Sequence, residues 1–281
     1  MSKAQRILVL GASGLIGRFV TDDLRARGFD VTGVARRLSP SQKATALDLE
    51  LPLMSMDRRA LARLIGDREV DLVANCLGVL QDGPGSDTHD VHRDFVERLL
   101  RAIRESGRAI RLVHISIPGA ADEDRAAFSA TKREAERLIA VFGIPYAILR
   151  PGFVVAPSAY SGSAMLRALA AFPVDLPAAE AAVPFQPVAV EDIAATIAWL
   201  AGRDSDDNTV NAVTWNLMQP QPVTLGGVID QFRRAFGTVD LPRLALAAFL
   251  LDLGARAGDL ASWLGWMPPM RTTATPSCGA A

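Results

Sequence analysis

The sequence of 281 residues predicts an α/β fold, a doubly wound parallel sheet followed by a small C-terminal lobe. Two observations support this. Short apolar runs alternate with amphipathic segments of helical length from Arg6 to Pro151, as in parallel strands joined by helical crossovers. After Gly152 this pattern gives way to prolines, small residues and interrupted apolar runs, which indicates a different architecture.

The first element is the segment RILVLGASGLIG, residues 6–17, in which a buried strand runs into a glycine-rich turn and then a helix. Gly11 allows the tight turn, Gly14 lets the backbone approach a pyrophosphate, and Gly17 lets the helix pack against the strand. The helix N-terminus also offers unpaired amides and a positive dipole end. We therefore expect a dinucleotide phosphate site made of Gly11, Ser13, Gly14, Leu15, Ile16 and Gly17.

The second strand starts at Asp30, soon after Gly28 ends the helix, and it leads into Arg36 and Arg37. An acidic side chain at this strand end would accept hydrogen bonds from the ribose of NAD, whereas arginine fits a 2′-phosphate. Because no Asp or Glu stands there, the sequence favours NADP(H) over NAD(H). The alternative is that both arginines are solvated loop residues.

The third and fourth strands are expected over residues 44–49 and 70–75, with a helix over residues 57–66 between them. The third strand ends near Asp48, whose carboxylate could bond the adenine amino group. A small turn after the fourth strand would run beside the cofactor ribose, and it comprises Asn75, Cys76, Leu77 and Gly78. Cys76 has no basic neighbour in the sequence to lower its pKa, so a small buried side chain is expected there.

A long helix is expected over residues 87–107, and it carries His89 and His92 at a spacing of three. A metal pair is one interpretation of this spacing. No third ligand accompanies the pair, so surface or packing histidines are the favoured interpretation and no metal is expected.

The fifth strand, in the segment IRLVHISIPG, places His114 and Ser116 on one face. Ser116 falls at the carboxyl end of the strand, where open α/β sheets bind their ligands. A helix bearing Phe128 and Lys132 follows, and a sixth strand is expected to stop at Pro151.

These elements divide the chain into a nucleotide-binding domain over residues 1–152 and a C-terminal substrate lobe over 153–187 and 205–270. Residues 188–204 are expected to form a helix that returns to the sheet, and residues 271–281 a disordered tail. The apolar run 244–251 is too short to span a bilayer, so a core or interface helix is expected, with peripheral membrane contact as the alternative.

The composition excludes several classes of protein. The formal net charge is −1, which leaves no broad basic surface for nucleic acid. The two cysteines, Cys76 and Cys278, lie far apart, so no disulfide framework and a cytoplasmic location are expected. We expect a monomer or homodimer whose partner is a small-molecule substrate or a protein.

Taken together, the sequence resembles the short-chain dehydrogenase/reductase superfamily, in its extended or atypical branch. The matching motifs, in order, are GASGLIG, NCLG, HIS, LRPGFVVAP and VAVEDIA. The resemblance implies an NAD(P)-binding Rossmann fold, and it is greatest to the group of NmrA-type redox-sensing proteins and the Rossmann-fold accessory subunit of respiratory complex I. It also adds Lys132 and Pro151 to the expected cofactor contacts.

The resemblance further implies a catalytic serine, tyrosine and lysine. Ser116 matches the serine and Lys132 the lysine, but Phe128 stands at the tyrosine position. The family's tyrosine exchanges a proton with the substrate oxygen, and a benzyl ring cannot. Such acid–base help contributes about 10²–10⁴ in rate.

Three functions therefore stay open. The first is an NADP(H)-dependent oxidoreductase acting on a small carbonyl compound, with Tyr160, His114 or a water relayed by Lys132 as the replacement acid. The second is a non-catalytic NADP(H)-binding redox sensor or assembly factor. The third is a nucleotide-sugar epimerase or dehydratase.

Overall fold

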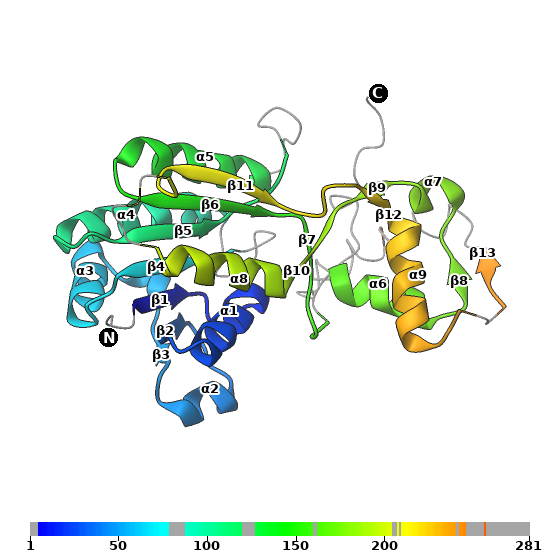
Figure 1. Cartoon of the computed structure of the whole chain (residues 1–281), viewed down its shortest axis with the longest axis horizontal. Helices are drawn as coiled ribbons and strands as arrows, with labels where there is room; N and C mark the ends of the chain where they lie inside the picture. The colour runs from blue at the N-terminus through cyan, green and yellow to red at the C-terminus, as the bar shows by residue number, and fades with distance from the viewer. Residues whose placement is uncertain are drawn as a thin grey trace. The chain divides into compact units, whose positions relative to one another are not determined.

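The computed structural model describes residues 5–78, 88–119, 127–159, 162–203, 207, 209–239, 242–245 and 256. The chain divides into two compact units (Figure 1). Unit 1 comprises Met1–Val154 and Val188–Met218, and unit 2 comprises Val155–Pro187 and Gln219–Ala281.

A seven-stranded sheet forms the centre of unit 1, in the order β11-β6-β5-β4-β1-β2-β3. Every neighbouring pair runs parallel, which confirms the predicted doubly wound α/β fold of the Rossmann type. The strands are β1 (Arg6–Leu10), β2 (Asp30–Ala35), β3 (Leu49–Glu50), β4 (Leu72–Asn75), β5 (Arg111–Ile115), β6 (Tyr146–Pro151) and β11 (Val213–Leu217).

Helices cover both faces of this sheet, and each face has its own apolar core (Figure 1). The cores follow from the alternation of β1, since Ile7 and Val9 enter one core while Leu8 and Leu10 enter the other. One core is shared with α1 (Leu15–Ala26) and α8 (Val190–Ala201). The other is shared with α3 (Arg58–Asp67), α4 (Phe95–Glu105) and α5 (Ala127–Phe142).

The strand order reverses between β1 and β4. From β1 the chain moves outward to β2 and β3, and it then returns to build β4, β5 and β6 on the other side. In open α/β sheets the ligand crevice lies outside the carboxyl ends of the strands at such a switch point. The functional residues are therefore sought after Leu10, Asn75 and Ile115.

The segment after β2 differs from the expected third strand over residues 44–49. Residues Pro40–Thr45 form the short helix α2, and only Leu49–Glu50 form β3. The cause is local, because Ser39 and Gln42 form a reciprocal capping box and Pro40 occupies the first helical turn. A 3₁₀ turn, η1 (Leu53–Ser55), follows β3.

Strand β11 lies in the sheet of unit 1, although residues 205–270 were expected in the C-terminal lobe. It pairs with β6 over its whole length, with Leu217 opposite Pro151. The strand β6 ends at Pro151, as the sequence predicts, although Arg150 and Pro151 themselves still pair with β11. Buried Arg111 links this side of the sheet to the end of α8, since its Nη1 donates to Leu200 O at 2.7 Å and its Nε to Asn211 Oδ1 at 3.1 Å.

Unit 2 contains two helices that pack together, α6 (Gly162–Ala171) and α9 (Leu225–Phe236). On α9, Ile229 is buried, whereas Leu225 and Phe232 are partly exposed. The short elements of the remaining chain are β7 (Phe153–Val155), β8 (Val174–Asp175), α7 (Ala178–Ala181), β9 (Pro184–Phe185), β10 (Pro187–Ala189), β12 (Val223–Thr224) and β13 (Leu244–Ala245).

Residues 244–251 were expected to form an apolar helix. Instead, Leu244 and Ala245 form the strand β13, which pairs with β8. The rest of that run and the expected tail, residues 271–281, lie outside the described residues. Within the described part of the chain, no helix has the length and apolar character needed to cross a bilayer.

Candidate cofactor and active site

The glycine turn after β1 leaves the start of α1 open to a phosphate. Gly11 has a φ of +84°, and its amide donates to Val34 O at 2.9 Å, which anchors the turn to β2. Gly14 is the N-cap of α1 and has no side chain that could cap the first amides. A Cβ on Gly17 would lie 2.2 Å from Gly11 O, so only glycine permits this close packing. The predicted members Ser13, Leu15 and Ile16 lie on the same turn, in partly or fully exposed positions. These features fit a dinucleotide pyrophosphate.

The turn after β4 meets the glycine turn. A Cβ on Gly11 would lie 3.0 Å from Cys76 O and 3.1 Å from Leu77 N. Asn75 shapes this second turn, since its Oδ1 accepts from Leu77 N at 3.2 Å. The structure thus brings together the two turns that the sequence predicted as cofactor contacts. Burial raises the pKa of the Cys76 thiol to about 12, so it stays a thiol at neutral pH.

Asp48 is held in a position that suits the adenine end of such a cofactor. Its Oδ1 accepts from Gly33 N at 2.9 Å and pairs with Arg25 Nη2 at 2.5 Å. Its Oδ2 is buried and has no hydrogen-bond partner among the described residues. A buried acceptor without a donor is costly, and an adenine amino group would satisfy it.

Two further predicted cofactor residues, Arg36 and Arg37, follow β2 and are exposed. Sequence reasoning missed Gln42 in this region, whose buried Nε2 donates to Ala12 O at 2.9 Å and thereby supports the glycine turn. The capping-box spacing of Ser39 and Gln42 was the signal that could have found the helix carrying it.

Lys132 lies where the ends of β4 and β5 meet. Its ammonium donates to Ile115 O at 2.8 Å and to Leu77 O at 3.3 Å, and a Cβ on Gly78 would lie 3.7 Å from Nζ. Burial lowers the pKa of Lys132 to about 8, against the opposing influence of Cys76 and Glu136. With two N–H groups engaged, the third suits a ribose hydroxyl.

Ser116 and His114 lie beside this lysine on β5 and its carboxyl end. Ser116 is buried, and its hydroxyl lies close enough to Glu136 to help lower the pKa of that carboxyl. His114 is fully buried, with Nδ1 3.1 Å from Asn75 Nδ2. Burial, and then Lys132 and His92, hold the pKa of His114 well below its usual value. His114 is therefore neutral, which weakens it as the replacement acid.

Arg133 and Glu136 of α5 and Arg150 of β6 hold this helix against its neighbours. The sequence analysis did not predict these contacts. Glu136 accepts from Arg150 Nε of β6 at 2.9 Å, and Arg133 donates to Pro118 O at 2.5 Å and Gly119 O at 2.6 Å. Burial raises the pKa of Glu136 more than any other single cause, but the hydrogen bonds from Arg150 and Ser116 and the charges of Arg150 and Arg133 together outweigh it, so the net shift is downward. Lys132, one turn before Glu136, is thereby held against the sheet.

Phe128 precedes Lys132 by one turn of α5 and contacts a second aromatic ring. Its centroid lies 5.3 Å from that of His92, and the rings meet edge to face at 75°. His92 is 1% exposed and its Nδ1 lies 3.0 Å from Thr131 Oγ1. The site therefore lacks the phenol but has a buried imidazole against the ring that replaces it. The other candidate acid, Tyr160, lies outside the described residues.

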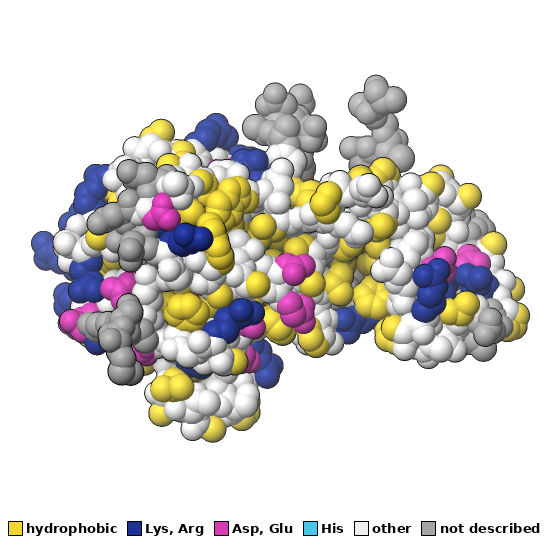
Figure 2. All heavy atoms as spheres, in the orientation of Figure 1, with side chains coloured by type: hydrophobic (Ala, Val, Ile, Leu, Met, Phe, Trp, Pro, Cys, Tyr) yellow, Lys and Arg dark blue, Asp and Glu magenta, His cyan; other side chains and the backbone are white. Residues whose placement is uncertain are grey.

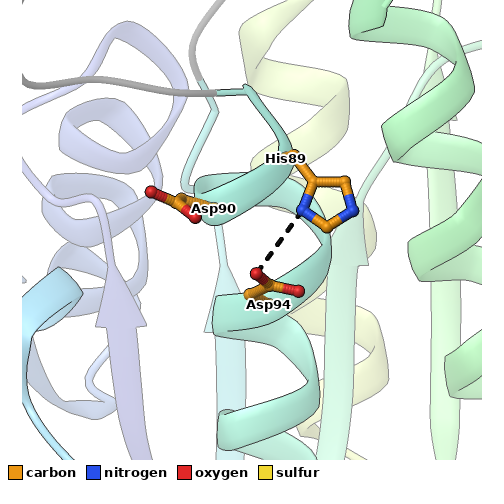
Figure 3. Close-up of side chains that lie close together, drawn as sticks. All are labelled: His89, Asp90 and Asp94. Atoms are coloured by element: carbon orange, nitrogen blue, oxygen red, sulfur yellow. Dashed lines mark ion pairs between the residues drawn. The ribbon is translucent and has the colours of Figure 1, made fainter.

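His89 does not share this position and points to the surface beside Asp90 and Asp94 (Figure 3). Its Nδ1 lies 3.4 Å from Asp94 Oδ2. Asp90 and His89 are exposed, and nothing beyond their proximity indicates an ion. Because His92 is buried while His89 is exposed, the two histidines do not form the metal pair that their spacing allowed.

Arginine side chains gather on a different part of unit 1, over α3 and α4 (Figure 2). They line a hollow of about 550 Å³ with Glu105 and Phe142. Arg58 pairs with Glu105 at 2.7 Å, and Arg104 lies 3.9 Å over the Phe142 ring. Glu105 and Phe142 end α4 and α5, which lead into the amino ends of β5 and β6, so the hollow is not part of the site at the carboxyl ends of the strands.

Comparison with known proteins agrees with this fold. Residues 7–208 match the NAD dependent epimerase/dehydratase family. The UDP-glucose 4-epimerase of Thermus thermophilus, solved with NAD, superposes with a TM-score of 0.68 at 20% identity over 87% of this chain and 86% of that one.

Two curated proteins are similar in sequence. A dTDP-6-deoxy-L-talose 4-dehydrogenase (NAD(P)(+)) from Kitasatospora kifunensis is 29% identical over 39% of this chain, and a 3-diazoavenalumate denitrifying reductase from a Streptomyces species is 31% identical over 59%. The chain covers 34% and 62% of their respective lengths, less than two thirds of either. On the match of residues 7–208, the chain belongs to the NAD dependent epimerase/dehydratase family, whose members bind NAD(P).

Proposed function

We propose that this protein is a nicotinamide-dependent oxidoreductase that interconverts a secondary alcohol and a ketone on a nucleotide-linked sugar. The observation that carries the proposal is the placement of Lys132 beside Gly78, at the carboxyl ends of β4 and β5 and close to the buried hydroxyl of Ser116. When bound there, the cofactor supplies hydride chemistry.

Each residue of the site has a distinct part in the proposal. The amides of Gly14, Leu15 and Ile16 bind the pyrophosphate, and Asp48 accepts from the adenine amino group. Lys132 holds the nicotinamide ribose. Ser116 donates its hydroxyl hydrogen to the substrate oxygen and polarises the C–O bond.

The substrate class comes from the relatives. The small carbonyl compound expected from the sequence gives way to a nucleotide sugar, because the family is that of epimerases and dehydratases and one relative is named for dTDP-6-deoxy-L-talose. We also propose NADP(H) as the preferred cofactor, on the two exposed arginines after β2 and the lack of an acidic residue there. The protein would act as a cytoplasmic monomer or homodimer.

The test combines binding and turnover. We would identify any co-purifying nucleotide by native mass spectrometry, and then incubate the protein with NAD⁺ or NADP⁺ and dTDP-6-deoxy-L-talose or UDP-glucose. Absorbance at 340 nm that depends on the sugar nucleotide and falls in Ser116→Ala would support the proposal. Cofactor binding without turnover of either sugar would contradict the proposed substrate class.

Phe128 favours a second candidate function, a non-catalytic NADP(H)-binding protein of the kind found in the NmrA-type group. The variant Phe128→Tyr separates the two. Activity that appears only in this variant would mean that the natural site senses or carries the cofactor, whereas comparable activity in both proteins would favour the enzyme.

A further inference from the structure

We infer that the arginine-lined surface over α3 and α4 is a second binding site, which takes a small ligand with two or more phosphate groups. This site is separate from the one that the proposed function uses, and it goes beyond that function. Three features support it: the charge of the lining, the guanidinium groups that no carboxylate neutralises, and the size of the space between them.

Arginines dominate the lining of this surface. Two hollows, of about 550 and 440 Å³, share Arg58 and Arg101 and so form one recess. The arginines that line the recess are Arg58, Arg59, Arg98, Arg101 and Arg104. The carboxylates of the described lining are those of Asp57 and Glu105. Five cations and two anions give this lining a formal charge of +3, on a chain whose net charge is −1.

Three of the five guanidinium groups have no counter-charge. Two of the arginines pair with glutamate side chains of α4. The other three, Arg59, Arg98 and Arg104, form no ion pair within the part of the chain that the structure describes. Gathering like charges around one space costs Coulomb energy, and a bound polyanion would reverse the sign of that interaction.

Backbone contacts hold two of these groups in place without neutralising them. Arg98 Nη2 donates to Met54 O at 2.9 Å, while Arg98 Nε is buried and has no hydrogen-bond partner among the residues described. Arg104 lies 3.9 Å from the centroid of the Phe142 ring and donates to the carbonyl oxygen of Phe142. Groups that are already oriented lose less entropy when they bind a ligand.

Phosphate is the anion that suits such a lining. A guanidinium group bonds phosphate oxygens through two parallel N–H donors and is more weakly hydrated than an ammonium. The volume of each hollow falls in the range of about 300–1,000 Å³ that is typical of small-molecule sites. Arg104 lines the larger hollow, whereas Arg59 and Arg98 line the smaller one. A ligand that engages both hollows therefore carries at least two phosphate groups.

The recess lies away from the cofactor site. Its larger hollow is bordered by the ends of α4 and α5, which lead into the amino ends of β5 and β6. Lys132 contacts backbone oxygens at the carboxyl ends of β4 and β5. A ligand in the recess therefore leaves the glycine turn and Lys132 free.

Isothermal titration calorimetry with inorganic tripolyphosphate tests this assignment. The double variant Arg59→Gln/Arg104→Gln removes one unneutralised charge from each hollow and should weaken binding by about tenfold or more. The matched control is Arg63→Gln/Arg68→Gln, which removes two exposed charges of α3 and its C-cap outside the recess and should not change the affinity. Gly14→Val should bind tripolyphosphate as tightly as the wild type, because the glycine turn is not involved.

The melting temperature provides a second measurement. Tripolyphosphate at about one hundred times its Kd should raise the melting temperature of the wild type by about 5 °C. It should have a much smaller effect on Arg59→Gln/Arg104→Gln, whose melting temperature without ligand should match that of the wild type. If that double variant does not fold, Arg59→Gln alone, at an exposed position, takes its place in both measurements.

Four results would overturn the assignment. The first is no heat with tripolyphosphate, and the second is equal weakening in the two double variants, which would indicate attraction by net charge alone. The third is loss of binding in Gly14→Val with none in Arg59→Gln/Arg104→Gln. The fourth is binding of poly-L-glutamate but not of tripolyphosphate, which would make the recess a surface for an acidic protein. None of these measurements uses turnover or a sugar nucleotide, so their outcome is independent of the proposed function.

Discussion

The ammonium of Lys132 lies in the protein interior, with two backbone carbonyls for partners and no carboxylate bonded to it. Burial dominates its electrostatics and lowers its pKa to about 8 from 10.5. The native state therefore releases this proton at a lower pH than the unfolded chain does. Keeping the charge in place below pH 8 costs folding free energy, and a ribose hydroxyl bound as proposed would offset part of that cost.

This cost predicts a pH dependence of stability. Between pH 8 and 10.5 the unfolded chain binds the Lys132 proton and the folded protein does not, so stability rises with pH across this window. Relative to Lys132→Met, the wild-type unfolding free energy should rise by about 3 kcal/mol in urea titrations. Lys43→Met, at an exposed lysine, is the control. Parallel curves for wild type and Lys132→Met would show that the lysine is not desolvated.

At the residue scale, the sequence predicted Ser116 and Lys132 because their motifs fix both type and spacing. It did not predict which of the two histidines, His89 or His92, is buried. A spacing of three residues is compatible with two exposed histidines or with one exposed and one buried. The π-helical turn decides between these two arrangements, and the sequence does not reveal that turn. Likewise, the pairing of Asp48 with Arg25 joins residues 23 positions apart and has no local signature.

At the element scale, α1 packs on the β1 turn through a contact that a side chain would destroy. In Gly17→Ala the added Cβ would meet the backbone of Gly11, so helix and turn must separate. We expect a loss of about 1–3 kcal/mol in stability and weaker cofactor binding. The matched control is Gly66→Ala in α3, where an added Cβ meets nothing within 4 Å. This substitution should stabilise the protein by about 0.5–1 kcal/mol. Equal melting temperatures of the two variants would contradict this picture of the turn.

The residues that follow β2 should determine whether NADP⁺ or NAD⁺ binds more tightly. Removing a charged donor to a phosphate costs about 1.5–3 kcal/mol, so Arg36→Ala and Arg37→Ala should each weaken NADP⁺ binding by about tenfold or more. NAD⁺ binding should not change, and Arg18→Ala on the exposed face of α1 should change neither. An equal effect on both cofactors, measured by calorimetry, would mean that these arginines do not contact the 2′-phosphate.

Most elements of unit 1 could be predicted, because strands buried on both faces are continuous apolar runs and the helices between them are amphipathic. The exceptions have physical causes. The capping box of Ser39 and Gln42 converts the start of the expected third strand into α2. Strand β11 pairs with β6 although the two lie far apart in the sequence, and no local pattern reveals which sheet a strand joins.

For the whole molecule, the two apolar cores hold the sheet rigid while its carboxyl edge presents turns and unpartnered polar atoms. Asp48 Oδ2 and His114 Nε2 are two of the seven buried side-chain atoms that lack a hydrogen-bond partner among the described residues. Stability alone does not explain such atoms, since each costs free energy when unsatisfied. Of these two, Asp48 Oδ2 is the atom that the proposed function satisfies, with the adenine amino group.

Binding of the cofactor at the glycine turn is therefore the central claim, and isothermal titration calorimetry tests it most directly. Titration of the purified chain with NADP⁺ should give one site per chain, with binding weakened at least about tenfold in Gly14→Val, which places side-chain atoms where the pyrophosphate must approach. No measurable heat with either NADP⁺ or NAD⁺, or equal affinity in the variant, would contradict the account.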